Sequence, residues 1–327
     1  MDKRTGNTVS VDAVNFGLII LSGALAHVVP YQLLAFSYAV LGPAHYLTQI
    51  SWLYDRKYFA TNIWVGPVMG AFTCLLALPA FIGIHVPDPW FGAILLCAAA
   101  SVALAFTLPR ARAFAGAAIT VLALVTLTLR FRGMALFVAV LLPTVIHIFV
   151  FTGAFMLHGA RRSGSVMAWA SVAALLACAA SFWILPVLPP AASVSHGAVA
   201  AFFTPVVDEL TSIGLDAGST QSLFGFLGFA YCYHYLNWFS KVNVIRWNDV
   251  PRDRLRTMAI VYALLLATYL INFAAGFALS LLLSVLHVLL EFPLNLRTFT
   301  WLGMDLASGV GRLRAALVRA ATGDSLR

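Results

Sequence analysis

Charged residues are scarce in this chain of 327 residues. Only 10% are Asp, Glu, Lys or Arg, whereas 61% belong to the set AVILMFWYC. A soluble domain carries roughly a quarter charged residues, because it must cover its surface with them. The composition therefore excludes an ordinary water-soluble globule, and it also excludes a disordered or collagen-like chain. It predicts a polytopic membrane protein whose charges lie in the loops.

Cysteine is also rare, and no CxxC pair occurs. The four cysteines all lie within apolar stretches: Cys74, Cys97, Cys178 and Cys232. This arrangement excludes a disulfide-stapled secreted domain and favours simple packing roles. No internal repeat is evident. The net charge of +8 is expected to reflect loop orientation in a membrane protein and not nucleic-acid binding.

The charged clusters divide the chain into apolar segments of about 20 residues, the length of a membrane-spanning helix. We therefore predict an all-α bundle of about ten transmembrane helices in a single domain, residues 1–296. The predicted spans are 13–29, 32–53, 60–84, 91–108, 114–129, 134–157, 166–188, 219–240, 256–271 and 274–295. The long connection 189–218 is expected to contain a short helix on the outer face.

The placement of charges also defines the last two predicted spans and the C-terminal tail. No charge occurs between Met258 and Glu291, which is too long for one crossing, so the last two spans are separated near Asn272 and Gly276. The segment 297–327 carries spaced arginines among apolar residues. It is expected to form a cytoplasmic amphipathic helix on the membrane surface.

Basic residues gather on alternate connections. With a cytoplasmic N-terminus, 18 of the 20 Lys and Arg residues fall on cytoplasmic segments, and Arg130 and Arg132 fall outside. The outer connections instead carry acidic residues such as Asp88 and Asp208. This asymmetry follows the positive-inside rule and predicts an even number of spans with both termini in the cytoplasm, in a bacterial-type inner (plasma) membrane. The start of the chain, with Ala24-Leu25-Ala26 after an apolar stretch, also fits a cleaved secretory signal.

Ionisable groups inside a span are costly and commonly functional. Four of the eight histidines lie well within predicted helices: His45, His147, His234 and His287. All four helices are even-numbered, so they run in the same direction. Counting to the charge that ends each helix, at 1.5 Å per residue, places the four imidazoles about 10–21 Å from the cytoplasmic end. We therefore expect one layer of histidines.

Several imidazoles at one depth favour a transition-metal site, since neutral histidine binds iron, copper and zinc. Glu291 is the only acidic residue inside a predicted span, so it is expected to be a ligand or an orienting partner. Ligand histidines normally donate their second N–H to a neighbouring polar group. Candidates one turn away are Glu291 for His287, Gln49 for His45, Asn237 for His234 and Thr144 for His147. His158 is expected at the surface or entrance, and His27, His85 and His196 at the outer side.

The segments 42–56 and 231–241 are rich in aromatic and polar residues. An aromatic belt at the interface accounts for part of this pattern. It does not account for Gln49 or for Pro43, which frees a backbone carbonyl two residues before His45. Tyr46 and Tyr231 are further candidates to support the reaction.

The stretch Gly42-Pro43-Ala44-His45, with isolated histidines on separate helices, resembles the Brp/Blh family of membrane β-carotene dioxygenases. In that family a four-histidine iron centre cleaves a polyene with dioxygen. The resemblance implies that the four histidines named above are the iron ligands here. The Pro-His-Gly segment of that family is absent, and no HxxxH pair occurs.

The leading hypothesis is a membrane-embedded non-haem metalloenzyme, most simply an iron oxygenase, with copper or zinc as alternatives. Its partners would be a lipophilic substrate, dioxygen and membrane lipids, without nucleic acid. A haem-binding or quinone-linked redox protein is one alternative. A proton-coupled transporter that uses the histidines and Glu291 as a relay is another, and a structural scaffold is a third.

Overall fold

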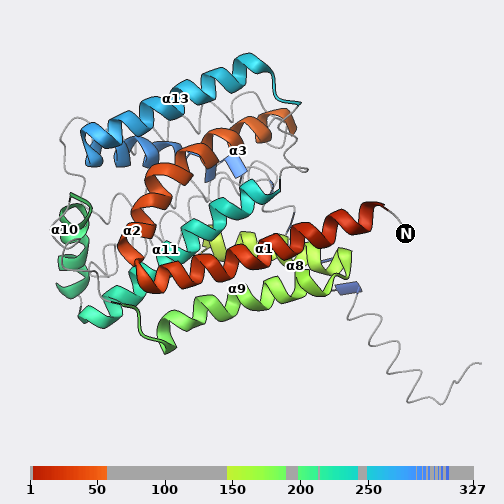
Figure 1. Ribbon diagram of the computed structural model, residues 1–327, viewed down its shortest axis with the longest axis horizontal. Helices are drawn as coiled ribbons and strands as arrows, with labels where there is room; N and C mark the ends of the chain where they lie inside the picture. The colour runs from red at the N-terminus through yellow and green to blue at the C-terminus, as the bar shows by residue number, and fades with distance from the viewer. Residues whose placement is uncertain are drawn as a thin grey trace, which may run out of the picture.

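The computed structural model describes residues 3–56, 146–188, 198–212, 214–241 and 249–284, together with part of 286–308. Three predicted spans, 60–84, 91–108 and 114–129, lie outside the described residues, as does the terminal part of the predicted tail. Figure 1 draws the described helices as coloured ribbons.

Every regular element in the described ranges is helical, which confirms the predicted all-α class. The elements are α1 Lys3–Val28, α2 Pro30–Phe36, η1 Ser37–Leu41, α3 Gly42–Arg56, η4 Ile146–Phe151, α8 Thr152–Ser163, α9 Val166–Ile184, α10 Ala198–Ser212, α11 Ala217–Ser240 and α13 Arg252–Ile271. The described residues of 273–308 are also all helical. We call them the C-terminal helical segment.

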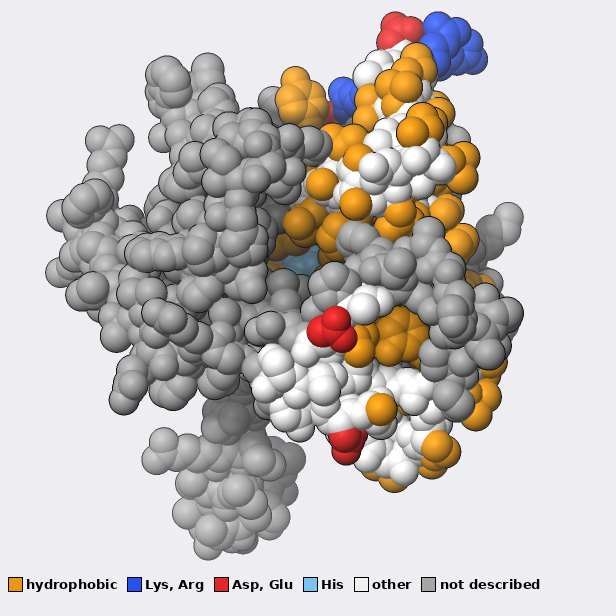
Figure 2. All heavy atoms as spheres, turned by 90° about the vertical axis from the view of Figure 1, so that its left-hand side faces the viewer, with side chains coloured by type: hydrophobic (Ala, Val, Ile, Leu, Met, Phe, Trp, Pro, Cys, Tyr) orange, Lys and Arg blue, Asp and Glu red, His pale blue; other side chains and the backbone are white. Residues whose placement is uncertain are grey.

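Three helices in this part of the chain are long and apolar enough to cross a membrane: Val11–Val28, Val166–Ile184 and Arg252–Ile271. Many of their apolar side chains are exposed, as those of lipid-facing helices are. On α13, Leu264, Leu270 and Ile271 are 62%, 89% and 86% exposed, which is unfavourable in water. Figure 2 shows hydrophobic side chains over much of the described surface and few charged ones. These features are compatible with a lipid solvent.

Contacts along α1 establish the relative directions of three helices. Ser171 on α9 donates to the backbone carbonyl of Asp12 near the start of α1, and His27 near its end contacts Ser181. Hence α1 and α9 are parallel, and they lie side by side in Figure 1. The end of α11 lies beside the first half of α1, because the Tyr233 hydroxyl donates a hydrogen bond to Asn15. Hence α11 is antiparallel to both.

A second group of helices packs on the other side of α11. Near the end of α3, Asp55 accepts a hydrogen bond from Arg254 at the start of α13. At its other end, α13 reaches back to η1, where the Tyr269 hydroxyl donates to the carbonyl of Tyr38. These two contacts make α13 antiparallel to the helix that carries His45 (Figure 1).

Two π-helical turns interrupt the α-helices beside the predicted site. The first, η1, lies immediately before Gly42 and Pro43, so the residue that lacks a backbone N–H follows a turn with altered hydrogen bonding. The second, η4, contains His147. Such turns rotate the side chains that follow them and often occur at functional sites. One of them precedes His45 by four residues, and the other contains His147.

The helix ends follow ordinary capping rules. Asn272 is extended, ends α13 and accepts a hydrogen bond from the backbone N–H of Ala275, so the chain breaks between two helices at the residue where a break was predicted. Gly164 adopts a left-handed conformation, φ 65°, and closes the turn between α8 and α9. Asp216 caps α11, and the backbone N–H of Ser219 lowers the pKa of its carboxyl group. The predicted short helix in the connection 189–218 is α10.

Glycine permits the close approach of α11 to its neighbours. A Cβ at Gly228 would lie 3.0 Å from the backbone oxygen of Pro30, and one at Gly225 would lie 2.9 Å from the ring of Phe182. Any side chain at these positions would separate the helices. The contact of α11 with α2 and α9 therefore depends on the absence of a side chain here.

Candidate metal centre

The four predicted histidines come together in the interior of the bundle. His45 lies on α3, His147 in η4, His234 on α11 and His287 on the C-terminal helical segment. All four are buried, with exposed fractions of 1%, 7%, 7% and 2%. The helices that carry them run in one direction: His45 contacts His287 while, one turn further along the same two helices, Gln49 contacts Glu291. These are the four histidines that were predicted to lie in one layer.

The four imidazoles form a closed ring. Neighbouring centroids are 4.8 Å apart for His45 and His234, and 5.0 Å for His234 and His147. The remaining sides, from His147 to His287 and from His287 to His45, are both 5.3 Å. Each imidazole therefore contacts two others, and His45 lies opposite His147. The interplanar angles of 67–85° make every contact edge-on.

Seven of the eight ring nitrogens in this cluster have no hydrogen-bond partner among the described residues. A buried polar atom without a partner is costly, and natural proteins satisfy nearly all of them. The exception is Nδ1 of His234, which lies 2.9 Å from the Thr152 hydroxyl. Four buried rings that meet and together have seven unsatisfied nitrogens therefore require an explanation beyond packing.

A buried carboxylate completes the cluster. Oε2 of Glu291 lies 3.8 Å from Nε2 of His147 and accepts a hydrogen bond of 2.7 Å from the Gln49 amide. Two overlapping groups bring their ligand atoms within 4.8 Å of one another: His45, His234 and His287 form one, and His147, His287 and Glu291 form the other. These residues can hold a metal ion, and His287 belongs to both groups.

The predicted pairings of His45 with Gln49 and of His234 with Asn237 are not the hydrogen bonds that the structure shows. Gln49 donates to Glu291, and both nitrogens of His45 lack a partner among the described residues. Likewise, the partner of His234 is Thr152 and not Asn237, whose Oδ1 has no hydrogen bond in this part of the chain. The reason is that these side chains point into the bundle, where residues of a neighbouring helix are nearer than the next turn.

The structure shows no hydrogen bond between the histidines and their other predicted partners where these are described. Glu291 does not hydrogen-bond to His287, whose two nitrogens are without partners among the described residues. Thr144 lies outside the described residues. Asn237 is buried at 6% exposure near the end of α11, and its side chain is not joined to any of the histidines.

Two pairs of buried tyrosines adjoin the cluster. The Tyr46 ring stacks on His287 with centroids 4.5 Å apart, and its hydroxyl shares a short hydrogen bond with that of Tyr235. Tyr231 is one turn further from the histidines and accepts a hydrogen bond of 3.0 Å from Tyr38. Tyr46 therefore touches the candidate centre directly, whereas Tyr231 contacts Tyr235, whose ring adjoins His45 and His234.

The remaining histidines lie away from the cluster where they are described. His27 hydrogen-bonds to Ser181 and stacks on Phe182 at the opposite end of α1, as expected for a residue outside the site. His158 lies at the far end of α8 and faces Trp301. His85 and His196 fall outside the described residues.

Sequence reasoning missed Thr152 and Tyr235. Thr152 lies five residues after His147 and belongs to the adjacent helix α8, so its distance along the chain gave no reason to pair it with His234. Tyr235 directly follows His234 and was available in the aromatic segment 231–241. The signal that could have found it is the spacing of Tyr231 and Tyr235, four residues apart on one face of α11.

Comparison of the chain with family models, with curated proteins and with solved structures finds no match in any of the three.

Proposed function

We propose that this chain is a membrane-embedded metalloenzyme with a four-histidine centre, an oxygenase that uses non-haem iron and acts on a lipophilic substrate. The observation that carries the proposal is the contact of four buried imidazoles beside one buried carboxylate, with seven of their eight ring nitrogens lacking a hydrogen-bond partner among the described residues. In an apolar interior the imidazoles are favoured in their neutral form, because a buried charge is costly. Neutral imidazole is the form that binds a metal.

The donor set fits a first-row transition metal. Imidazole nitrogens suit iron, copper and zinc, whereas calcium and magnesium take oxygen ligands. His45, His147, His234 and His287 would hold the ion, with Glu291 as a further ligand or as a neighbour that orients His147. When bound, iron would supply the activation of dioxygen. The resemblance of the Gly42-Pro43-Ala44-His45 stretch to the Brp/Blh family agrees with iron.

Other residues would fix the ligands and control protons. The Thr152 hydroxyl, 2.9 Å from Nδ1 of His234, determines which nitrogen of that ring faces the centre. Gln49 directs its amide at the Glu291 carboxylate and holds it near His147. Tyr46 and Tyr235 share one hydrogen bond beside His287, so this pair can hold a proton close to the site.

The finer topology belongs to the same proposal. Ten spans with both termini in the cytoplasm of a bacterial-type inner membrane would place the cluster on the cytoplasmic side of the bilayer centre. The outward apolar side chains of α9 and α13 support a lipid environment. A substrate that enters from the bilayer would reach an apolar, water-poor interior, which protects reactive intermediates.

The ring contacts favour a single ion over haem. Neighbouring imidazoles lie 4.8–5.3 Å apart, centre to centre, which is direct contact. A porphyrin bound through two of them would have to separate rings that touch. The transporter alternative has no comparable observation in its favour.

The test is elemental analysis of the purified full-length protein, paired with four single variants: H45A, H147A, H234A and H287A. We expect about one transition-metal ion per chain and a loss of most of it in each variant. His27→Ala is the matched control, because His27 is a bonded histidine at the other end of α1, and it should keep its metal. A content below about a tenth of an ion per chain in freshly purified protein would contradict the proposal, as would a Soret band or metal-free transport in vesicles.

A further inference from the structure

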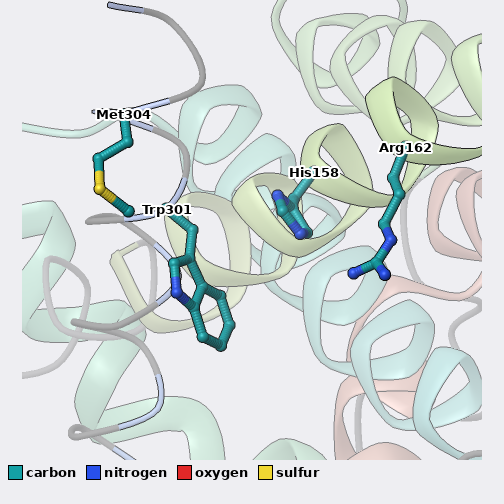
Figure 3. Close-up of a pocket in the computed structure, with 4 residues that line it drawn as sticks. All are labelled: His158, Arg162, Trp301 and Met304. Carbon is teal, nitrogen blue, oxygen red and sulfur yellow. The ribbon is translucent and has the colours of Figure 1, made fainter. Parts of the chain in front are cut away.

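A cavity of about 260 Å³ opens between α8 and the C-terminal helical segment, away from the histidine cluster. It is lined by His158 and Arg162 from α8 and by Trp301 and Met304 from the opposite helix. Figure 3 shows Trp301 facing His158 across this space, and their ring centroids are 6.1 Å apart. The cavity therefore has one wall with a cationic group and one apolar wall.

The cavity lies at the end of the seam between two of the helices that carry the histidines. His158 follows His147 by 11 residues, along η4 and then α8. Phe155, on α8, packs against Leu290 and Leu294 between these two levels. The cavity therefore lies at the C-terminal end of α8, beyond the level of the cluster.

Charged groups collect at this end of the bundle. Asp55, which ends α3, is paired with Arg254 at 2.6 Å, and Arg256 is paired with Asp253 at 3.4 Å. By contrast, Arg162 has no salt-bridge partner within the described ranges, and it is exposed to the cavity. An unpaired guanidinium beside an indole ring and a thioether suits a ligand with an anionic head and an apolar body.

We propose that this cavity binds the phosphate head group of an anionic membrane lipid. The Arg162 guanidinium and the imidazole of His158 would face the phosphate, while Trp301 and Met304 would cover the first part of the acyl chains. Trp side chains with this amphipathic character are typical of the membrane interface, and basic residues there attract anionic lipids. The site is separate from the metal centre, and the bound lipid would hold the ends of α8 and the C-terminal helical segment together.

The experiment uses the purified full-length protein in a neutral detergent. Native mass spectrometry would count the bound lipid during titration with dioleoylphosphatidylglycerol, and the thermal midpoint would be followed in parallel. Dioleoylphosphatidylcholine and inorganic phosphate would be titrated in the same way. We expect at least about tenfold weaker binding of the zwitterionic lipid, and a rise in the thermal midpoint with phosphatidylglycerol only.

Single variants test the cationic wall and the apolar wall of the cavity separately. Arg162→Gln should weaken phosphatidylglycerol binding about tenfold, since it removes a charge-assisted contact, whereas R162K should retain most of it. Arg252→Gln is the matched control, because it removes the same charge from an exposed position at the start of α13, and it should bind as the wild type does. Trp301→Ala should weaken lipid binding without altering any response to phosphate.

Three results would overturn the proposal. The first is unchanged lipid binding in Arg162→Gln. The second is an equal loss in Arg162→Gln and Arg252→Gln, which would indicate general charge attraction. The third is a response to inorganic phosphate as strong as the response to the lipid, with no effect of Trp301→Ala, which would indicate a site for a free anion. The metal content of each variant should equal that of the wild type, so failure of this proposal would leave the metal proposal unaffected.

Discussion

Gln49 and Glu291, 242 residues apart in the chain, are joined by a hydrogen bond of 2.7 Å in the interior of the bundle. Gln49 lies one turn beyond His45 on α3, and Glu291 lies one turn beyond His287. The amide donates to the same oxygen, Oε2, that lies 3.8 Å from Nε2 of His147. One polar contact therefore links α3, the C-terminal helical segment and the helix that carries His147.

Replacing Gln49 by methionine should weaken metal binding about 10- to 100-fold, a typical result of losing a residue that orients a ligand. Methionine has a similar shape but cannot donate to the Glu291 carboxylate. The affinity would be measured by competition with a chelator. Gln221→Met is the control, because it is the same substitution at a glutamine whose amide donates to the carbonyl of Leu188 and not to a residue of the cluster. Wild-type affinity in Gln49→Met would show that this hydrogen bond does not support the centre.

Thr152→Val should also lower metal affinity, by about 10- to 100-fold, since valine keeps the branched shape but cannot hydrogen-bond to Nδ1 of His234. Thr152→Ser retains the hydroxyl and should restore most of the affinity. Thr211→Val serves as the comparison, because the Thr211 hydroxyl only contacts the backbone of α10. If valine and serine at position 152 gave the same affinity, the orienting role would be refuted.

Tyr46 has two contacts that substitution can separate. Tyr46→Phe keeps the ring on His287 but leaves the buried Tyr235 hydroxyl without its hydrogen bond, at a cost of about 1–3 kcal/mol of stability. Its metal content should stay near that of the wild type. Tyr46→Ala removes the ring as well and should lower both quantities. Denaturation in detergent and elemental analysis would measure the two effects, and a fully stable Tyr46→Phe would contradict this account.

Gly228→Val should strongly destabilise the bundle. Its Cβ alone would lie 3.0 Å from the Pro30 carbonyl oxygen, a backbone atom that cannot move without shifting α2. Gly159→Ala is the matched control on an exposed helical position, where a Cβ has no neighbour within 4 Å. The control is expected to be neutral or stabilising by about 0.5–1 kcal/mol. Equal thermal midpoints for Gly228→Val and the wild type would show that this close approach is unimportant.

The sequence predicted the level of the four histidines but not their partners. Their depth followed from counting residues to the charge that ends each helix, because every residue adds a constant rise. Partners depend in addition on how each helix is rotated about its axis and on which helices are neighbours. Gln49 was assigned to His45 because they are four residues apart, yet its amide is nearer to Glu291 on another helix.

Of the interruptions in the helices, the break at Asn272 was predicted and the two π-turns were not. Asn272 was recognised as a break because a single apolar stretch was too long for one crossing. The π-turns at η1 and η4 were not predicted, since their sequences, SYAVL and IHIFVF, are ordinary helix-compatible residues. For η1, the following Pro43 lacks the backbone N–H that would continue the α-helical pattern, but the sequence alone does not locate the turn at which the pattern changes.

The histidine cluster draws its members from positions as far apart as 45 and 287 in a chain of 327 residues. During synthesis His45 enters the growing protein long before its neighbour in the imidazole ring exists. In the proposed metal centre, no short section of the nascent chain would therefore supply the full set of ligands. Loading of such a centre would follow synthesis of the C-terminal helical segment, and a chain that ends before residue 287 would lack one of the four histidines.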